Sequence, residues 1–182
     1  MRIEGKTITL KDGRSCLLRN PTAADAEALI EYLKITAAET PYLTQYPEEI
    51  SYTPEAEQEV LEKKLEAERG IMIVAEVDGK IIGNSSFGPV SEKIRSRHRC
   101  SLGIALFKAY RGLGIGSALF EQLLYEAEKC GYEQAELEVV STNKRGIALY
   151  RKMGFEEYGR RPHGMKYKDG TYADEILMVK NL

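Results

Sequence analysis

The segment Ser101–Leu119, SLGIALFKAYRGLGIGSAL, constrains the fold more than any other part of the chain. Its apolar residues up to Leu106 form a short run typical of a buried strand, and apolar residues recur at helical spacing from Leu119 to Cys130. Between the two patterns, glycines at positions 112, 114 and 116 allow a tight turn and a close approach of the backbone to a ligand. A helix that begins there directs unpaired N–H groups and about half a positive charge at whatever lies in front of it. The segment therefore predicts a strand, a glycine-rich loop and a helix, with a phosphate site where the helix begins.

The spacing of the glycines narrows the kind of phosphate loop. The dinucleotide pattern G-x-G-x-x-G does not fit glycines two residues apart, and no Gly-Lys-Ser/Thr completes a Walker loop. Arg111, Gly114 and Gly116 instead match the signature R/Q-x-x-G-x-G. This signature resembles the pyrophosphate-binding loop of the GNAT superfamily of N-acetyltransferases, which hold acetyl-CoA there.

A second motif lies one helix and one strand further along the chain. The segment from Asn143 to Phe155, NKRGIALYRKMGF, resembles the second GNAT signature, N-x-x-A-x-x-L-Y-x-K-x-G-F. Tyr150 stands seven residues after Asn143, as in the family, whereas Gly146 takes the position of the family's alanine. The resemblance covers Cys100–Tyr158, and outside it the chain looks more weakly like bacterial acetyltransferases that act on small amines and amino acids. On two motifs in the family's order, the chain is identified as a member of the GNAT superfamily.

Hydrophobic periodicity and turn signals outline the other elements. Strands are expected at Thr7–Leu10, Ser15–Arg19, Ile71–Val77, Lys80–Phe87, Cys100–Leu106, Ala135–Val140 and Ile176–Val179, and helices at Ala23–Lys34, Pro54–Arg69, Gly114–Cys130 and Asn143–Met153. Two segments without a clear period, Ile35–Tyr52 and Arg160–Thr171, are interpreted as loops. An antiparallel hairpin followed by a parallel crossover predicts a mixed sheet. We therefore expect a single GNAT-like α/β domain over residues 1–182, with about six to seven strands flanked by about four helices.

Composition argues against several classes of protein. No apolar run approaches the ~20 residues of a membrane span. No Cys/His cluster has metal-ligand spacing, and no basic stripe with interleaved aromatic residues indicates a nucleic-acid partner. Three widely spaced cysteines are typical of a reducing compartment, so a cytoplasmic location is expected. The segment Thr22–Arg69 carries twelve acidic and four basic residues, which indicates either a solvated helix face or a lobe that attracts a cationic amine.

The resemblance also implies which residues bind the co-substrate, acetyl-CoA; no metal is expected. In the family, the strand before the loop pairs its backbone with the pantetheine arm, the loop holds the pyrophosphate, and the asparagine of the second motif contacts the amide arm. The matching positions are Ile104, Ala105, Leu106, Arg111, Gly112, Leu113, Gly114, Ile115, Gly116, Ser117 and Asn143. Simpler alternatives exist for two of them, since Arg111 could be a solvated loop arginine and Asn143 could be only a helix N-cap.

Tyr150 is the residue for which the resemblance implies a catalytic role. Attack on the thioester expels a thiolate whose pKa is near ~8.5, below the ~10 of tyrosine. A hydrogen bond that strengthens as the thiolate develops therefore describes the role better than full proton transfer. The alternative is a tyrosine that only packs beneath Phe155. The base that deprotonates the amine stays open among a water chain and the side chains of His98, Ser101, Glu76 and Glu138.

These observations predict an enzyme that moves an acetyl group from acetyl-CoA to a primary amine of a small molecule, by direct attack in a ternary complex. Two alternatives remain, namely acetylation of a protein N-terminus or lysine, and a CoA-binding sensor without turnover. The choice of amine depends on Ile35–Tyr52 and Arg160–Thr171, the segments with the weakest pattern. A homodimer is a further expectation, because a sheet edge and the C-terminal tail could pair between subunits.

Overall fold

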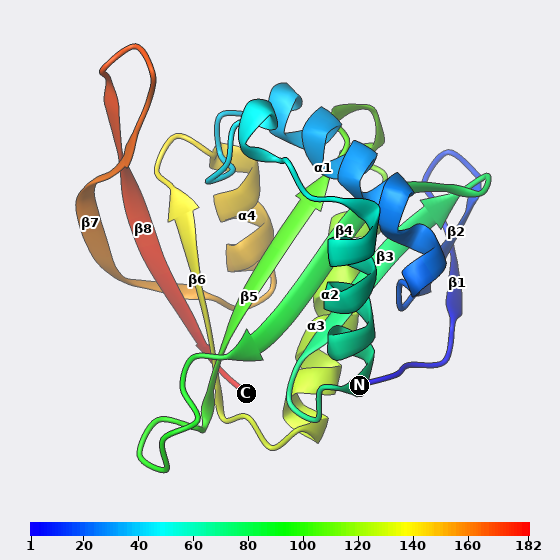
Figure 1. Ribbon diagram of the computed structural model, residues 1–182. Coiled ribbons are helices and arrows are strands. Elements are labelled where there is room, and N and C mark those ends of the chain that lie inside the picture. Colours follow the sequence, from blue (N-terminus) through cyan, green and yellow to red (C-terminus); the bar gives the residue numbers. More distant parts are fainter.

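The fold is built on one continuous sheet of eight strands, which the computed structural model describes together with the rest of residues 1–182 (Figure 1). The strands are β1 (Lys6–Thr9), β2 (Ser15–Arg19), β3 (Ile71–Val77), β4 (Lys80–Pro89), β5 (Arg99–Leu106), β6 (Gln134–Val140), β7 (Glu156–Lys166) and β8 (Tyr172–Asn181). They lie side by side in the order β1-β2-β3-β4-β5-β6-β8-β7. The pair β5–β6 is parallel and every other pair is antiparallel.

Four helices cover the two faces of the sheet. They are α1 (Ala26–Glu39), α2 (Pro54–Glu66), α3 (Ile115–Lys129) and α4 (Lys144–Lys152). Tyr32 of α1 packs against Phe107, at the end of β5, with ring centroids 5.0 Å apart. A Cβ on Gly116 of α3 would lie 3.6 Å from the side chain of Leu106. Because adjacent side chains along a strand point to opposite faces, α1 and α3 lie on opposite sides of the sheet, as Figure 1 shows.

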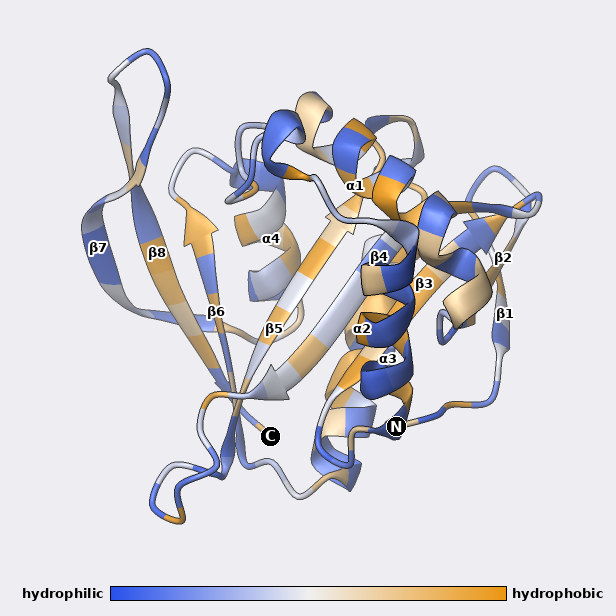
Figure 2. Ribbon diagram, in the orientation of Figure 1, coloured by the Kyte–Doolittle hydropathy of each residue, from blue (hydrophilic) through white to orange (hydrophobic).

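The core lies between the sheet and these helices. Figure 2 shows apolar residues recurring along the strands, whereas the outer turns of α2 are hydrophilic. The main hydrophobic cluster contains 33 buried residues from both faces of the sheet, so one contiguous core supports the whole fold. None of the helices combines the length and the apolarity that crossing a bilayer requires.

Most of the expected elements are confirmed, including the four helices and the mixed sheet, but two expectations are wrong. The sheet has eight strands rather than six or seven, because Glu156–Lys166, most of which was expected as a loop, forms β7. Helix α1 continues to Glu39 instead of ending at Lys34, and its last turns are held by Thr36, whose hydroxyl donates to Tyr32 O at 2.7 Å. The added end of α1 borders the region between β5 and β6, whereas β7 forms the edge of the sheet beyond β8.

The sheet opens between its two parallel strands. Pairing of β5 with β6 is restricted to Arg99–Ser101 opposite Gln134–Glu136. From Leu102 to Leu106, β5 remains paired with β4 on its other side but has no partner toward β6. The two strands therefore diverge and leave a wedge between them, on which the functional site is built.

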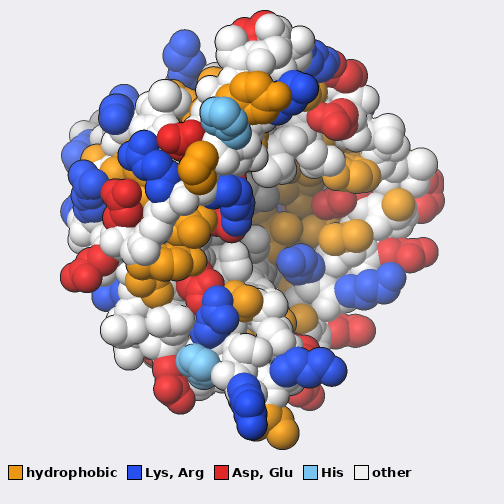
Figure 3. All heavy atoms as spheres, turned by 90° about the vertical axis from the view of Figure 1, so that its left-hand side faces the viewer, with side chains coloured by type: hydrophobic (Ala, Val, Ile, Leu, Met, Phe, Trp, Pro, Cys, Tyr) orange, Lys and Arg blue, Asp and Glu red, His pale blue; other side chains and the backbone are white.

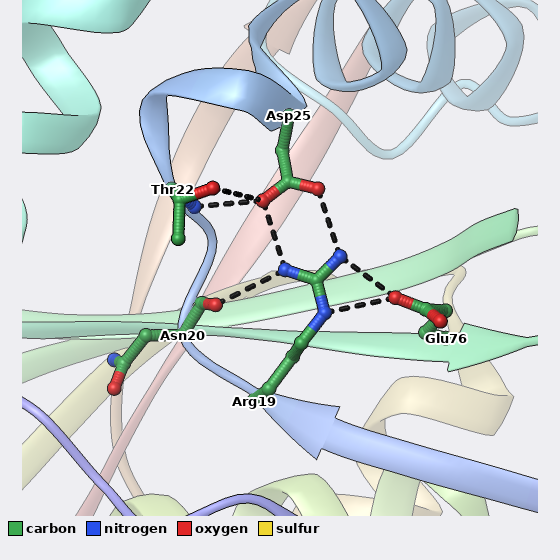
Figure 4. Close-up of polar contacts among 5 residues, drawn as sticks. All are labelled: Arg19, Asn20, Thr22, Asp25 and Glu76. Atoms are coloured by element: carbon green, nitrogen blue, oxygen red, sulfur yellow. Dashed lines mark hydrogen bonds and ion pairs between the residues drawn. The ribbon is translucent and has the colours of Figure 1, made fainter. Parts of the chain in front are cut away.

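A polar cluster at the other end of the sheet joins β2, β3 and the start of α1 (Figure 4). Arg19 donates to both carboxylate oxygens of Asp25 at 2.8 Å, to Glu76 at 2.8 Å and to the carbonyl of Asn20 at 3.2 Å. Asp25 also accepts the N–H of Thr22 at 2.7 Å, which closes a capping box. The five N–H groups of Arg19 are thereby all occupied, since a second ion-pair contact to Glu76 measures 2.7 Å. This arginine is structural.

Replacing Asp25 with asparagine is expected to lower the stability by about 1–2 kcal/mol at neutral pH. Arg19 lowers the pKa of the Asp25 carboxyl, so the stabilisation is fully present above the unfolded-state pKa of about 3.9 and is lost as the pH falls further, toward the folded-state pKa. The difference in melting temperature between D25N and the wild type should therefore be constant from pH 7 down to about pH 4 and shrink progressively as the pH falls further. Asp12→Asn is the matched control, because its pair with Arg14 is exposed and should contribute almost nothing at any pH in this range.

Candidate active site

A cavity of about 520 Å³ occupies the wedge between β5 and β6. Its wall combines the edge of β5, the end of β6, the loop before α3 and one side of α4 with the end of α1 and the residues that follow it. The α4 and α1 contributions come from opposite faces of the sheet, so the cavity passes between the strands. Figure 3 views the molecule from the β7–β8 side and shows a hollow in this surface.

The open edge of β5 presents free backbone groups to the cavity. Odd-numbered residues bond toward β4: Phe107 N donates to Ile82 O at 2.9 Å, and Arg99 O accepts from Val90 N at 3.1 Å. Because backbone groups alternate along an antiparallel strand, those of Leu102, Ile104 and Leu106 point toward the wedge. The predicted pantetheine-binding residues Ile104, Ala105 and Leu106 all line the cavity. The outward groups are the N–H and C=O of Ile104 and the N–H of Leu106, since the carbonyl of Leu106 accepts from Arg111.

The glycine loop lies at one end of the cavity with its N–H groups unpaired. Gly112 and Gly114 have φ of +90° and +98°, a conformation that other residues rarely adopt. The first intrahelical bond runs from Ala118 N to Gly114 O at 3.1 Å, which leaves the N–H groups of residues 115–117 without a helical partner. Of the predicted loop residues, Arg111, Gly112, Gly114, Gly116 and Ser117 line the cavity.

Two predicted loop residues do not line it with their side chains. Ile115 is fully buried in the core, and Leu113 packs partly against it. Their contribution is through the backbone, since the carbonyl of Leu113 accepts from Lys11 N at 3.3 Å and ties the loop to the β1–β2 turn.

Basic side chains surround the loop. Arg111 donates to the carbonyl of Leu106 at 3.3 Å, so it is more than a solvated arginine. Lys11 and Arg145 also line the cavity, and Arg145 reaches to within 3.7 Å of where a Cβ on Gly112 would lie. Neither Lys11 nor Arg145 was predicted. The signal for Arg145 was its position two residues after Asn143, on the first turn of a helix that begins at the same cavity.

Asn143 serves as a cap and as part of the wall. Its Oδ1 accepts from Gly146 N at 3.0 Å, which caps α4, and its side chain lines the cavity. A Cβ on Gly146 would lie 2.7 Å from the Asn143 amide nitrogen, so in this chain the cap packs closely against the glycine that stands at the position of the family's alanine.

Tyr150 is held in the core with its hydroxyl free. The residue is 8% exposed, and its ring packs against Phe120 with centroids 5.2 Å apart and against Phe155 at 6.3 Å. It lines the cavity, and its hydroxyl makes no hydrogen bond within the protein. Burial alone raises the pKa of Tyr150 to about 12, so this side chain is a neutral donor at physiological pH. Tyr150 therefore packs against Phe155, as expected of a purely structural tyrosine, and also has a free hydroxyl.

The four candidate bases are scattered, and Glu138 alone lies on the cavity wall. Glu76 is held by Arg19 in the cluster of Figure 4. His98 lies at the far end of β5, beside Arg97 and Glu133, and Ser101 is exposed outside the cavity. An ion pair with Arg161 lowers the pKa of Glu138, which makes it a weak base.

The far wall of the cavity is formed by residues without a sequence signal. Thr36, Thr40, Tyr42, Leu43 and Thr44 line it from α1 and the segment that follows. They belong to the stretch whose periodicity decays, and tertiary contacts such as that of Tyr42 with Thr142, just after β6, bring them to the site.

Comparison with known proteins shows the family to which the chain belongs. The family model described as acetyltransferase (GNAT) family matches residues 32–155. An N-alpha-acetyltransferase of Sulfurisphaera tokodaii is 30% identical over 94% of this chain and 96% of its own length. The L-amino acid N-acetyltransferase AaaT of Escherichia coli is 30% identical over 59% of this chain and 66% of its own length.

Similarity to solved structures extends over nearly the whole chain. A GNAT-family acetyltransferase from Streptococcus pneumoniae superposes with a TM-score of 0.87, at 28% identity, over 92% of this chain and 99% of that one. Several other curated relatives match over a shorter stretch, since the chain spans about a fifth of one and two-thirds or less of three others. The chain belongs to the acetyltransferase (GNAT) family, whose members use acetyl-CoA as cofactor.

Proposed function

We propose that the protein transfers an acetyl group from acetyl-CoA to the primary amine of a small molecule, by direct attack in a ternary complex. The observation that carries this proposal is the cavity itself. It joins an unpaired strand edge, a helix N-terminus with free N–H groups and the unpartnered hydroxyl of Tyr150.

The residues present fit the parts of acetyl-CoA. The outward N–H and C=O groups of Ile104 and the N–H of Leu106 suit an amide-containing arm, which would pair with β5 as an added strand. The N–H groups at the start of α3, together with Arg111 and Arg145, suit a pyrophosphate. When bound, acetyl-CoA supplies the thioester carbon that the amine attacks. Asn143 lines the same cavity as β5 and the loop before α3.

Tyr150 has the properties of a donor to the departing sulfur. Its hydroxyl has no partner in the protein and lines the cavity, and its ring is fixed by Phe120 and Phe155. A neutral donor that is fixed in place stabilises negative charge as that charge develops. We assign Tyr150 this role and leave the amine's proton to solvent or to Glu138.

The acceptor side supports a small amine rather than a long peptide. The segment after α1 is linked to the β7–β8 turn, because Tyr46 Oη accepts from Lys168 N at 2.9 Å and Lys168 also forms an ion pair with Glu48. Closer to α4, Tyr42 Oη donates to Thr142 O at 3.3 Å. These contacts bridge the segments on either side of the acceptor end and narrow the route for a chain.

The test is acetyl-CoA binding by calorimetry and thiol release with amino acids, polyamines and short peptides as acceptors. We expect saturable binding and release that depends on a small amine. Release with peptides alone would make the protein a peptide N-acetyltransferase, and binding without release for any amine would make it a sensor. Absence of acetyl-CoA binding would contradict the assignment of the loop before α3.

A further inference from the structure

An arginine shared by two carboxylates lies at the acceptor end of the cavity. Arg161 of β7 donates to both oxygens of Glu138 at 2.7 Å and to Glu175 Oε2 at 2.7 Å. Glu138 forms part of the cavity wall, on the face of the sheet that also holds α1. The carboxylate of Glu138 therefore lies between the guanidinium of Arg161 and the space in which the acceptor must bind.

The hydrogen bonding of Arg161 is incomplete. A guanidinium has five N–H donors, and three hydrogen bonds to Glu138 and Glu175 leave two donors without a protein partner. Arg19 is the internal comparison, since all its donors are used and it lies away from the cavity. The side chain of Arg161 is 47% exposed, so a ligand can approach it.

The two carboxylates differ in how firmly they are held. Glu175 is buried, with 10% of its side chain exposed, whereas Glu138 has 49% exposed. Gly164 fits above Glu175 because it has no side chain, since a Cβ there would collide with the carboxylate. The pairing of β7 with β8 is irregular between Arg161 and Met165, where His163 adopts a φ of +54°. Glu175 thus anchors Arg161 from the buried side, and Glu138 is the partner that can move away.

We propose that Arg161 binds a carboxylate next to the acceptor amine, which takes the place that Glu138 occupies in the free protein. A carboxylate fits the guanidinium because two parallel N–H···O bonds match its two oxygens. Released from Arg161, the Glu138 carboxylate remains on the wall and faces the acceptor's ammonium group. Glu175 is a positioning residue, since it keeps Arg161 in place during the exchange.

This inference rests on the proposed function and narrows its substrate class to amines that carry a nearby carboxylate, as a free α-amino acid does. The amine of a peptide N-terminus has a peptide carbonyl at that position, and a polyamine has no acidic group. Both should therefore be poorer acceptors.

The experiment compares kcat/KM for an α-amino acid with that for the amine obtained by removing its carboxylate. We expect the wild type to prefer the amino acid, and Arg161→Gln to reduce this preference about 10- to 50-fold, mainly through KM. Arg161→Lys keeps the charge without the paired donors and should restore only part of it. Arg160→Gln is the matched control, because Arg160 precedes Arg161 on β7 and pairs with Asp174 at 3.3 Å, so the preference should not change.

A second measurement does not depend on the variants folding. The carboxylic acid that lacks the amine should inhibit the wild type competitively against the amino acid. The proposal is overturned if this acid does not inhibit, or if R161Q folds and keeps the wild-type preference. Turnover of both acceptors with equal efficiency would overturn it as well while leaving acetyl transfer intact, whereas failure to bind acetyl-CoA would remove the proposed function and this inference together.

Discussion

Replacing Tyr150 with phenylalanine is expected to lower kcat about 100- to 1,000-fold and to leave the affinity for acetyl-CoA unchanged. The expectation follows from a hydroxyl that lines the cavity and has no partner in the free protein. Its hydrogen bond would form with the sulfur as negative charge develops there. An interaction made only in the transition state changes kcat and not ground-state binding.

The same geometry predicts that Y150F remains stable. Removing the hydroxyl leaves no buried group unpaired, and the phenylalanine ring keeps its contacts with Phe120 and Phe155. The melting temperature should therefore stay at or slightly above that of the wild type. A large loss of kcat without a loss of stability would separate the chemical role of Tyr150 from its packing.

The pKa of Tyr150 also determines the expected pH profile. Burial raises the pKa to about 12, some 3.5 units above the ~8.5 of a thiol, so full proton transfer is more costly than a free tyrosine would make it. The hydroxyl stays protonated throughout pH 6–10, and kcat should show no alkaline fall from its ionisation in this range. Tyr150 acts as a fixed donor, and this sharpens the expectation from the sequence.

Tyr125→Phe is the control for this experiment, because Tyr125 lies on α3 with 57% of its surface exposed. It should keep wild-type kcat. If Y150F also retained wild-type kcat, the hydroxyl would have no part in the reaction, and the reading of Tyr150 as a core tyrosine would suffice.

The parts of the fold that were predicted correctly carry their signal locally. The strand, loop and helix around residues 101–119 follow from hydrophobic periods and glycines within one short segment. The strand β7 was missed for the opposite reason. Glycines at 159 and 164 and Pro162 interrupt its pattern, and two irregularities in its pairing with β8 absorb them. Its strand character comes from that partner and cannot be read from β7 alone.

The site divides in the same way. Most of the residues proposed to bind the co-substrate lie in two contiguous motifs, whereas Lys11 and Arg145 also line the cavity and were not predicted. The acceptor end of the cavity is bounded by the end of α1, the residues that follow it and Glu138 of β6, and Glu138 is backed by the ion pairs of Arg161 with β6 and β8. Arg161 meets Glu138 and Glu175 from positions 23 and 14 residues away in sequence. Such contacts leave no local pattern, so the acceptor end of the site could be described only from the structure.

Gly114→Ala is expected to weaken acetyl-CoA binding at least about 100-fold. Gly114 has a φ of +98° and is the N-cap of α3, so a side chain there strains the backbone that aims the N–H groups of residues 115–117. Because each of those bonds to phosphate is charge-assisted, losing the alignment of one or two costs this much affinity. The added Cβ would meet no protein atom within 4 Å, so the effect on binding would come from the loop and its ligand rather than from a clash.

Gly131→Ala is the matched control, since it places the same side chain at the other end of α3. Gly131 has a φ of +74° and equally open surroundings, so the backbone strain is of the same kind and both variants should lose about 1 kcal/mol of stability. Calorimetry should find wild-type affinity for acetyl-CoA in G131A and a large loss in G114A. Equal affinities in the two variants would mean that the start of α3 does not hold the pyrophosphate, because the only effect of either substitution would then be backbone strain.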